Sequence, residues 1–442
     1  MNVYEIIKKK RDGLELSRDE IGFMIDGFIN GRVKDYQMAA FLMAVYFRGM
    51  SARECLDLTL AMVDSGEKVD LSEIKGFKID KHSTGGVGDK TTLVLAPLVA
   101  ASGGIVAKMT GRELGHTGGT VDKLESIEGM QLELTKERFI EVVNKIHVSL
   151  ICQTASLAPA DKYIYALRNV TATVDSIPLI ASSIMSKKLA AGTDGIVLDV
   201  KTGRGAFMQK YEDALALSRT MVDIGEGAGK RVVAIVTSME QPLGYAVGNA
   251  VELQEAMDTL KGRGPKDLEA LVIELGSQML FLSGVVSSKR EARDRIETNM
   301  KTKKGLEKLG DLIEAQGGTR TFIENPALLP QPKQKVKVNA EGSGYVQKID
   351  ALEVGLASMS LGAGGKSKDE PIDHSIGIIL RKKVGDKVNK GEPLALFCTD
   401  GDSRKIETAK EKFLNAYQIG RKRAEPPKLF YAKVSRDGVE EY

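Results

Sequence analysis

The first 65 residues carry apolar side chains at helical spacing, interrupted by short polar stretches. Ser17 and Glu20 have the spacing of a capping box, and apolar positions 21, 24, 25 and 28 follow on one helical face. Asp35 is placed to cap a second helix over 38–47, and Ser51-x-x-Glu54 opens a third. These residues therefore predict a domain built from helices.

From about residue 75 the pattern changes to short apolar runs that alternate with helical stretches. The candidate strands are residues 77–79, 104–107, 195–200 and 232–236. Residues 91–101 form an apolar stretch long enough for a helix between the first two strands. Short strands that alternate with helices are typical of an α/β fold with a mainly parallel sheet.

The helical pattern returns over residues 160–192, where Pro178 suits a helix start and Gly192 a helix end. The chain therefore enters each of its first two domains twice. We predict a helical domain made of residues 1–70 and 160–192. We predict an α/β domain made of residues 75–159 and 193–330.

A segment rich in proline and lysine, residues 327–337, has the composition of a linker. Beyond it, residues 344–349 and 377–397 alternate short apolar runs with turn residues. We predict that residues 338–442 form a third domain of mostly β, α+β structure. The fold class is α/β plus α, with a mixed or parallel sheet in the α/β domain.

The charge balance narrows the possible partners. The chain has 63 basic and 60 acidic residues, a formal net charge of +3. Such a balance does not indicate a polybasic nucleic-acid binder. The longest uncharged run, residues 91–107, is interrupted by proline and glycine and is too short for a membrane span. We expect no nucleic-acid or membrane partner, and, because the N-terminus shows no apolar signal segment, a cytoplasmic protein.

Cysteine and histidine offer little chemistry of their own. The three cysteines are far apart, without a C-x-x-C pair, and the four histidines lack metal-ligand spacing. Glycine is the one residue in excess, with 46 in 442. The placement of those glycines points to the candidate site.

Two glycine-rich segments, residues 81–89 and 108–120, each begin with a lysine and each follow a predicted strand. Glycine lets the backbone approach a ligand closely, and a helix N-terminus offers unpaired N–H groups to an anion. A plain strand-to-helix turn is the alternative, but the nearby lysines and hydroxyls favour a phosphate site. Neither segment spells a P-loop or the G-x-G-x-x-G dinucleotide motif.

A third cluster lies in the returning helical stretch. Tyr165 and Arg168 come first, and Ser183 and Lys187 stand four residues apart on one helix face. Lys187 and its neighbour Lys188 could instead be solvated surface charges. A hydroxyl, an ammonium and a guanidinium on one face would suit a planar ligand with carbonyl oxygens.

Taken together, four segments resemble the thymidine and pyrimidine-nucleoside phosphorylase family, and the bacterial pyrimidine-nucleoside phosphorylases in particular. They begin at Lys81, Thr110, Tyr165 and Ser182 and read KHSTGGVGD, TGRELGHTGGTVDKLESI, YALR and SSIMSKK. The resemblance implies a homodimer whose helical and α/β domains are separated by a closing cleft. It implies reversible phosphorolysis of uridine, deoxyuridine and thymidine to free base and (deoxy)ribose 1-phosphate.

The resemblance also implies roles for individual residues. Phosphate would be held by Lys81, Ser83, Thr92, Lys108, Met109, Thr110 and Thr120. The base would be held by Tyr165, Arg168, Ser183 and Lys187, and catalysis would rest on His82, Arg168 and Lys187. A potassium ion would be bound by Gly88, Lys90, Leu243, Ala246 and Glu255, with Lys90 contributing its carbonyl.

Four positions depart from the family pattern. Thr110 stands where serine is usual, Glu113 replaces a glycine, Asn169 an aspartate and Arg204 a small residue. The sequence leaves three alternatives open: a phosphorylase restricted to thymidine, a related phosphoribosyltransferase, and a lipoyl-type binding module at residues 384–394. We expect this last region to be only structurally related to lipoyl domains, because no lysine hairpin for the prosthetic group is evident.

Overall fold

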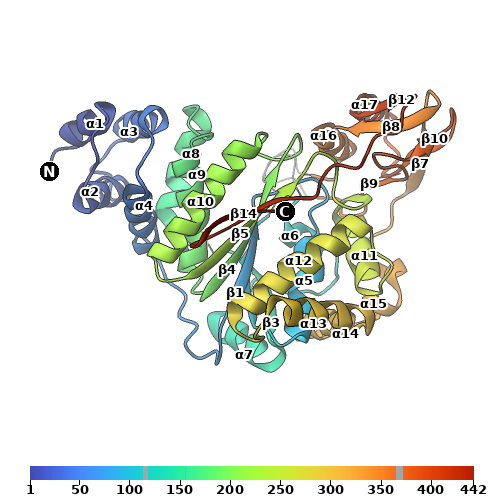
Figure 1. Ribbon diagram of the computed structural model, residues 1–442, viewed down its shortest axis with the longest axis horizontal. Helices are drawn as coiled ribbons and strands as arrows, with labels where there is room; N and C mark the ends of the chain where they lie inside the picture. The colour runs from blue at the N-terminus through green and yellow to red at the C-terminus, as the bar shows by residue number, and fades with distance from the viewer. Residues whose placement is uncertain (113–117, 155, 365–371) are drawn as a thin grey trace.

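The computed structural model describes residues 1–112, 118–154, 156–364 and 372–442. Figure 1 shows a helical bundle at the N-terminus, a central sheet between helices, and a C-terminal region on the far side of that sheet from the bundle. The predicted combination of helical, α/β and α+β parts is therefore confirmed.

The N-terminal bundle begins with α1 (Val3–Arg11), α2 (Arg18–Ile29), α3 (Asp35–Arg48) and α4 (Ala52–Asp64). The predicted capping boxes at Ser17 and Ser51 are both present. The prediction of Asp35 as an N-cap is wrong by one residue. Lys34 holds that position because the side chain of Gln37 accepts its backbone N–H at 3.0 Å.

Two further helices, α8 (Pro159–Val170) and α9 (Ile177–Ala190), confirm the predicted return of helical structure. Ile164 of α8 packs into the core of the bundle. Met185 and Leu189 of α9 instead pack with the side chains of the central sheet. Helix α9 therefore connects the bundle to the sheet.

The central sheet has the strand order β1-β4-β5-β13-β14. Its strands are β1 (Ile79–Ser83), β4 (Gly195–Thr202), β5 (Arg231–Ser238), β13 (Phe430–Ser435) and β14 (Gly438–Glu441). The first three run parallel, and β13 lies antiparallel to β5. A second parallel pair, β2 (Val106–Thr110) and β3 (Val148–Cys152), lies next to β1.

The C-terminal prediction requires one correction. Residues 430–441 form β13 and β14, which are hydrogen-bonded to the central sheet and not to the other C-terminal strands. The alternating pattern of this short hairpin does not reveal its partner, because any exposed strand edge can accept it. The predicted linker is also shorter, since a 3₁₀ turn, η1 (Pro326–Leu328), precedes a strand that begins at Gln334.

Helices cover both faces of the central sheet (Figure 1). Helix α10 (Tyr211–Gly227) packs on one face, and α12 (Lys266–Ser283) on the other. Helix α5 (Thr91–Ala101), predicted with the same bounds, is almost wholly buried. It is surrounded by α11 (Asn249–Leu260), α12, α13 (Lys289–Lys301) and α14 (Lys304–Ala315).

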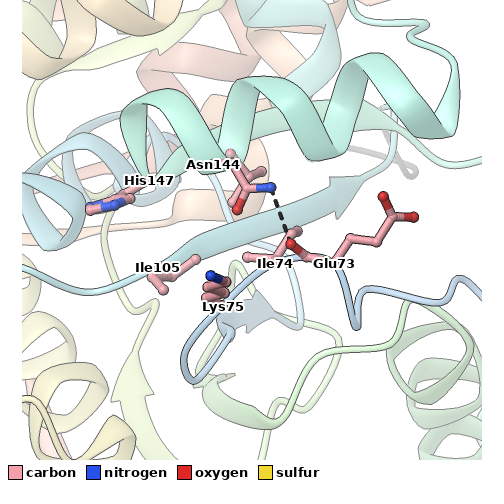
Figure 2. A pocket seen from close by; sticks show the side chains of 7 residues that line it. Glu73, Ile74, Lys75, Ile105, Asn144 and His147 are labelled. Atoms are coloured by element: carbon pink, nitrogen blue, oxygen red, sulfur yellow. Dashed lines mark hydrogen bonds between the residues drawn. The ribbon is translucent and has the colours of Figure 1, made fainter.

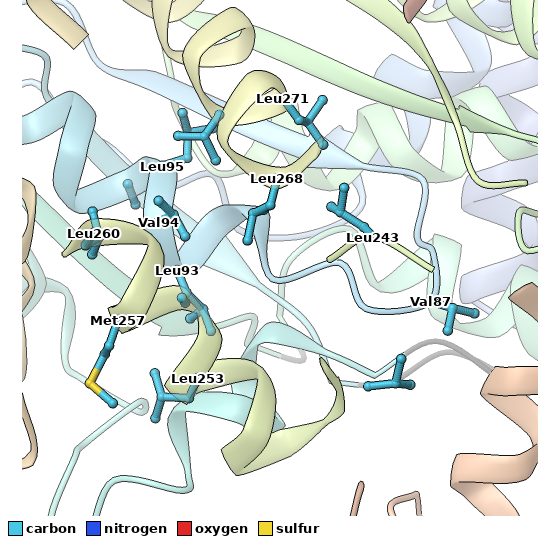
Figure 3. Packing of buried hydrophobic residues seen from close by; sticks show 14 of the residues in the cluster. Val87, Leu93, Val94, Leu95, Leu243, Leu253, Met257, Leu260, Leu268 and Leu271 are labelled. Atoms are coloured by element: carbon cyan, nitrogen blue, oxygen red, sulfur yellow. The ribbon is translucent and has the colours of Figure 1, made fainter. Parts of the chain in front are cut away.

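Burial on all sides explains why α5 reads as a continuous apolar run. Figure 3 shows its leucine and valine side chains packed among those of α11 and α12. This core fixes the N-terminal end of α5, where the first glycine-rich segment ends. Three short helices complete the region: α6 (Thr120–Leu124), α7 (Lys136–Ile146) and α15 (Thr321–Glu324).

The C-terminal region contains two small sheets. One has the order β10-β8-β12, and the other the order β6-β9-β11-β7. The strands are β6 (Ala246–Gly248), β7 (Gln334–Asn339), β8 (Gly344–Ile349), β9 (Gly377–Leu380), β10 (Lys387–Val388), β11 (Pro393–Thr399) and β12 (Tyr417–Gly420). Two helices, α16 (Ala351–Leu361) and α17 (Ser403–Ala416), pack against each other. Strand β6 belongs to the α/β part of the chain. The four-stranded sheet that contains it therefore joins the α/β part to the C-terminal region.

Candidate active site

The two predicted phosphate segments begin inside strands. The sequence places strands at 77–79 and 104–107, whereas β1 and β2 extend to Ser83 and Thr110. Their carboxyl ends carry polar side chains that are buried, so hydrophobic patterning ends each strand too early. Ligands of parallel α/β sheets bind at these carboxyl ends. Lys81 and Lys108 therefore lie where the fold favours a site.

Lys81 provides a buried positive charge that is not fully used. Its side chain is 3% exposed, and its ammonium makes no hydrogen bond to any residue that the structure describes. The nearest carboxylate oxygens belong to Asp199 and Asp89, at 3.4 and 3.7 Å from Nζ. A buried ammonium in this state is suited to bind an anion.

Lys108 and Lys188 share one buried carboxylate. The Nζ of Lys108 lies 3.1 Å from Oδ1 of Asp80, and the Nζ of Lys188 lies 2.9 Å from Oδ2. Lys108 also donates to the carbonyl of Lys81 at 2.5 Å, and Lys188 to that of Met109 at 3.0 Å. The network ties β1, β2 and α9 together.

Charge is not balanced by carboxylates alone in this cluster. A fourth lysine, Lys201, lies 2.7 Å from Asp199, whose other oxygen accepts the Thr237 hydroxyl at 2.6 Å. Four ammonium groups thus face three carboxylates: Lys81, Lys108, Lys188 and Lys201 against Asp80, Asp89 and Asp199. A bound phosphate would supply the missing negative charge.

The predicted hydroxyls lie at the ends of strands or the starts of helices. Ser83 ends β1, where its oxygen accepts the Gly85 N–H at 3.2 Å. Thr92 is in the first turn of α5, and Thr110 ends β2; both are buried. Thr120 is the first residue of α6. Each is therefore at a strand end or helix start.

Asp89 is held ionised. Burial opposes its charge, but Lys81 and Lys201 and hydrogen bonds from Ser83 and Thr91 keep its pKa well below the ordinary value. The carboxylate can therefore hold the Lys81 side chain in place at neutral pH.

His82 is surrounded by positive charges. Burial and the charges of Lys188, Lys108, Lys81 and Lys187 place the pKa of His82 well below its ordinary value. The imidazole is therefore neutral near pH 7 and can serve as a hydrogen-bond donor, not as a cation.

Lys108 should couple phosphate binding to proton uptake. Burial, opposed by Asp80 and assisted by Lys188 and Lys81, lowers its pKa to about 7. Above that pH, Lys108 is largely neutral in the free site. A bound phosphate dianion stabilises the protonated form of Lys108 and so raises its pKa. We expect net proton uptake on phosphate binding at about pH 8, and an affinity that falls by up to about tenfold per pH unit above neutrality.

Calorimetry in buffers of different ionisation enthalpy measures this uptake. Lys108→Met is the matched control, because it removes the titrating group and should remove the dependence of the binding enthalpy on the buffer. Equal enthalpies for the unaltered protein in all buffers would contradict the prediction.

The predicted base-binding residues lie on two helices. Tyr165 and Arg168 are on α8, and Ser183 and Lys187 are on α9. Lys187 donates to the carbonyl of Ser183 at 2.6 Å and to its hydroxyl at 3.1 Å, and it pairs with Asp161. The prediction that Ser183 and Lys187 share one face of a helix is thus confirmed.

Arg168 is buried and its guanidinium holds the connection between α8 and α9. It donates to the carbonyls of Thr173, Val174 and Leu179 at 3.2, 2.7 and 3.1 Å. The Tyr165 ring centre lies 5.6 Å from the guanidinium carbon. Contact with a ligand therefore requires Arg168 to share or exchange one of these hydrogen bonds.

The groups predicted to bind the base and the phosphate are adjacent through α9. Lys188 is bonded to Asp80 in the phosphate cluster, and its neighbour Lys187 acts electrostatically on His82. Sequence reasoning left Lys188 as a possible surface charge and did not identify Asp80, Asp161 or Asp199. The sequence did carry a signal for these three carboxylates, because each lies within two residues of a lysine in a predicted strand or helix or directly after one.

The five predicted potassium ligands also come together, but around a side chain. The ammonium of Lys90 lies 3.0 Å from the Leu243 carbonyl, 2.7 Å from the Ala246 carbonyl and 2.6 Å from Oε2 of Glu255. The sequence interpretation assigned Lys90 a role through its carbonyl. In the structure its side chain occupies the centre of the group.

Three of the four departures from the family pattern can be placed, and Thr110, at the end of β2, is described above. Arg204 pairs with Asp350 at 2.6 Å and so contacts the residue that caps α16. Asn169 is exposed on α8. Glu113 lies outside the described residues. The Arg112 guanidinium, which precedes it, binds Glu125 at 2.7 and 2.8 Å.

Two surface pockets lie away from this cluster. A pocket of 290 Å³ lies between α7 and the segment before β1 (Figure 2). There the Asn144 side chain donates to the Glu73 carbonyl at 3.2 Å. A second pocket, of 460 Å³, is lined by residues such as Leu60, Lys68 and Asp194. Neither contains a predicted site residue, so the site is defined by its chemistry.

Comparison with known proteins agrees with this geometry. Residues 4–66 match a glycosyl transferase family, helical bundle domain, and residues 75–306 match the a/b domain of that family. Residues 345–420 match a pyrimidine nucleoside phosphorylase C-terminal domain. These bounds cover the bundle, most of the α/β part and the small C-terminal sheets.

Individual relatives are similar over nearly their full length. The chain is 52% identical over 435 residues to a pyrimidine-nucleoside phosphorylase of Geobacillus stearothermophilus, covering 98% of this chain and 100% of the relative. It is 55% identical over 394 residues to one of Staphylococcus aureus, covering 89% and 91%.

A solved structure with a similar fold is an anthranilate phosphoribosyltransferase from Thermus thermophilus. The TM-score is 0.58 at 19% identity, over 70% of this chain and 99% of the other, which shows the fold alone. The two pyrimidine-nucleoside phosphorylases match this chain at 52% and 55% identity, far above the 19% of this solved structure. The chain belongs to the pyrimidine-nucleoside phosphorylase family of glycosyl transferases.

Proposed function

We propose that the protein catalyses the reversible phosphorolysis of pyrimidine nucleosides: nucleoside and phosphate give free base and (deoxy)ribose 1-phosphate. The observation that carries the proposal is that the charged groups around Lys81 and Asp80 lie next to the Lys187–Asp161 pair. Lys81 has no hydrogen-bond partner among the described residues, and Lys188 links its surroundings to Lys187. An anion and a base could therefore be held side by side. The relatives named pyrimidine-nucleoside phosphorylase support the same reaction.

Phosphate binding is a task of positioning. The anion is already a nucleophile and needs no base; it must be held in line with C1′ of the sugar. Lys81 and Lys108 supply charge, and the hydroxyls of Ser83, Thr92, Thr110 and Thr120 supply donors. The backbone of Met109 belongs to the same wall, since it lies between Lys108 and Thr110 on β2.

Departure of the base is the step that needs charge stabilisation. Negative charge develops on the pyrimidine oxygens as the bond to C1′ breaks. Lys187 and Arg168 can stabilise that charge by charge-assisted hydrogen bonds, with the neutral His82 as a further donor. Lys187 must then turn from Asp161 to the base. No covalent intermediate is required, because phosphate itself forms the new bond to C1′.

Release of base from uridine, deoxyuridine and thymidine, with and without phosphate, tests the function. We expect uracil and thymine only when phosphate is present, together with equal amounts of sugar 1-phosphate. Release from thymidine alone would favour the thymidine-restricted alternative. Transfer to an aromatic acid from a ribosyl pyrophosphate, without phosphorolysis, would favour a phosphoribosyltransferase and contradict the proposal.

We further propose that the protein acts as a homodimer. Large apolar side chains are exposed on three helices of the bundle and offer apolar area to a partner. They include Tyr4, Tyr36, Phe47, Tyr163 and Val170, at 63%, 74%, 75%, 56% and 80% exposure. Helix α3 packs against α1 and α8, which places these residues on neighbouring helices (Figure 1). A second copy of the chain is the partner we assign to them.

We also assign the protein to the cytoplasm. Its three cysteines, Cys55, Cys152 and Cys398, are all free thiols, as is usual in a reducing compartment. In the described part of the chain, no helix is both long and apolar enough to cross a membrane.

A further inference from the structure

A lysine ammonium is enclosed where the first glycine-rich segment meets α5. Lys90 is the N-cap residue of that helix, and its side chain is fully buried. Its Nζ donates to two carbonyls and one carboxylate, all within 2.6–3.0 Å. Gly88 completes the enclosure: a Cβ added there would lie 2.6 Å from the Leu243 carbonyl oxygen and 3.4 Å from Nζ.

The oxygens around this ammonium are fixed in advance by other contacts. Both carboxylate oxygens of Glu255 accept the Tyr245 N–H, at 3.0 and 3.1 Å, and Oε2 also accepts the Ala246 N–H at 3.1 Å. The Leu243 N–H donates to the Val87 carbonyl at 3.0 Å. Such a rigid set of oxygens is a site for a monovalent cation, and here Lys90 is that cation.

Charge in the surroundings is already balanced. On the other side of the 242–246 turn, the ammonium of Lys383 donates to the carbonyls of Pro242 and Gly244 at 2.5 and 2.9 Å and pairs with Asp267 at 2.9 Å. Two buried ammonium groups therefore face two carboxylates, Glu255 and Asp267. A further cation would have no carboxylate of its own and would be repelled by both lysines.

We propose that the side chain of Lys90 takes the place of the potassium ion that the family resemblance led us to expect, so that this protein neither binds nor needs potassium at Gly88, Leu243, Ala246 and Glu255. An ammonium group carries the same charge as potassium and donates to the same oxygens. The difference is that it is covalently attached and cannot be lost by dilution.

Lys90 acts as a positioning residue for the phosphate site. It directly follows the segment that carries Lys81 and Asp89, and it ties that segment to the 242–246 turn. Its loss should therefore act through the position of Lys81 and raise the KM for phosphate more than it lowers kcat. This part of the inference rests on the proposed function, whereas cation binding and stability do not.

The first test uses the unaltered protein. Its thermal unfolding midpoint and its KM for phosphate should be the same in potassium, sodium and tetramethylammonium chloride at equal ionic strength. A midpoint or KM that improves specifically with potassium would overturn the proposal, whatever the variants do.

The second test compares two substitutions. Lys90→Thr removes the ammonium and opens the site, so its midpoint should fall by several degrees and its phosphate KM should rise about tenfold. Potassium, but not tetramethylammonium, should reverse both changes. Lys90→Met removes the same charge but fills the space, and it should lose stability without rescue by potassium.

The outcomes distinguish failure of the proposed replacement of potassium by Lys90 from failure of the proposed function. A potassium-dependent midpoint in Lys90→Thr alone supports the replacement even if no phosphorolysis is detected, in which case only the proposed function fails. A stable Lys90→Thr protein that does not respond to potassium in either measurement would contradict the inference.

Discussion

Replacing Lys187 by alanine should reduce phosphorolysis by about 30- to 1,000-fold, corresponding to about 2–4 kcal/mol of lost transition-state stabilisation. The side chain is 28% exposed, so its ammonium can reach a ligand, and it is already oriented by Ser183. The charge that it places near the leaving base has no substitute on α9, because Lys188 is committed to Asp80.

Lys187→Ala alone also leaves Asp161 without its partner. Asp161 is buried, and it lies in the first turn of α8, where the helix dipole only partly stabilises a negative charge. We therefore expect a modest loss of stability in this variant. The double variant Lys187→Ala/Asp161→Ala should regain stability but not activity, which separates the catalytic loss from the structural one.

Kinetics with saturating phosphate, combined with thermal unfolding, measures both effects. Lys162→Ala is the matched control, because Lys162 is exposed on the same helix as Asp161. It should keep near-normal turnover. If the double variant recovered turnover to within about threefold, Lys187 would not contact the departing base.

Arg168 cannot be tested in the same way. The sequence alone suggests that removing it affects turnover and spares the fold. The structure shows three hydrogen bonds, to the carbonyls of Thr173 and Val174 in the α8–α9 connection and of Leu179 in the first turn of α9. Arg168→Ala would leave buried carbonyls unpaired, so it should lower stability as well as activity.

Hydrophobic patterning predicts the parts of this fold in which apolar side chains are buried and polar side chains are exposed. The capped helices of the bundle and the buried helix α5 are examples, since each has a face or a whole surface in contact with a core. The carboxyl ends of β1 and β2 are predicted poorly because Lys81 and Lys108 are polar and yet buried. Functional side chains break the pattern at the place where the site lies.

The sequence also predicts which residues belong to the site better than it predicts which side chains they pair with. The lysines of the phosphate segments can be found from their glycine neighbours, but Asp80 and Asp199 can be paired with them only in three dimensions. Lys90 shows the same limit. The structure does bring Lys90 together with Leu243, Ala246 and Glu255, but the direction of its side chain depends on the 242–246 turn, more than 150 residues away in the chain.

Replacing Asp80 by asparagine should produce the largest loss of stability, about 3–5 kcal/mol, because it removes the one carboxylate between two buried ammonium groups. Asp80 is completely buried and is bonded to Lys108, Lys188 and the Lys81 N–H. Burial opposes its ionisation, but the two lysines still hold its pKa below the ordinary value. Asparagine keeps the size of the side chain, but it removes the charge and turns one acceptor oxygen into an NH2 donor that faces an ammonium group.

The control for this loss is Asp194→Asn, directly before β4, the strand that pairs with β1. Asp194 pairs with Lys78 at 2.8 Å but is 31% exposed, so its replacement should cost less than about 1 kcal/mol. Urea unfolding of both variants and of the unaltered protein gives the comparison.

The stability lost in Asp80→Asn should depend on pH in a defined direction. Asp80 raises the pKa of Lys108 against burial, so without this carboxylate Lys108 titrates at still lower pH in the folded protein, and below its value in the unfolded chain. The unfolded chain then binds more protons across that interval, so stability rises with pH and the deficit is greater at about pH 6 than at about pH 9. Phosphate should stabilise the variant more than the unaltered protein, because the anion replaces the missing negative charge next to Lys108. A deficit below about 1 kcal/mol, or one that does not change with pH, would show that Asp80 does not balance these lysines.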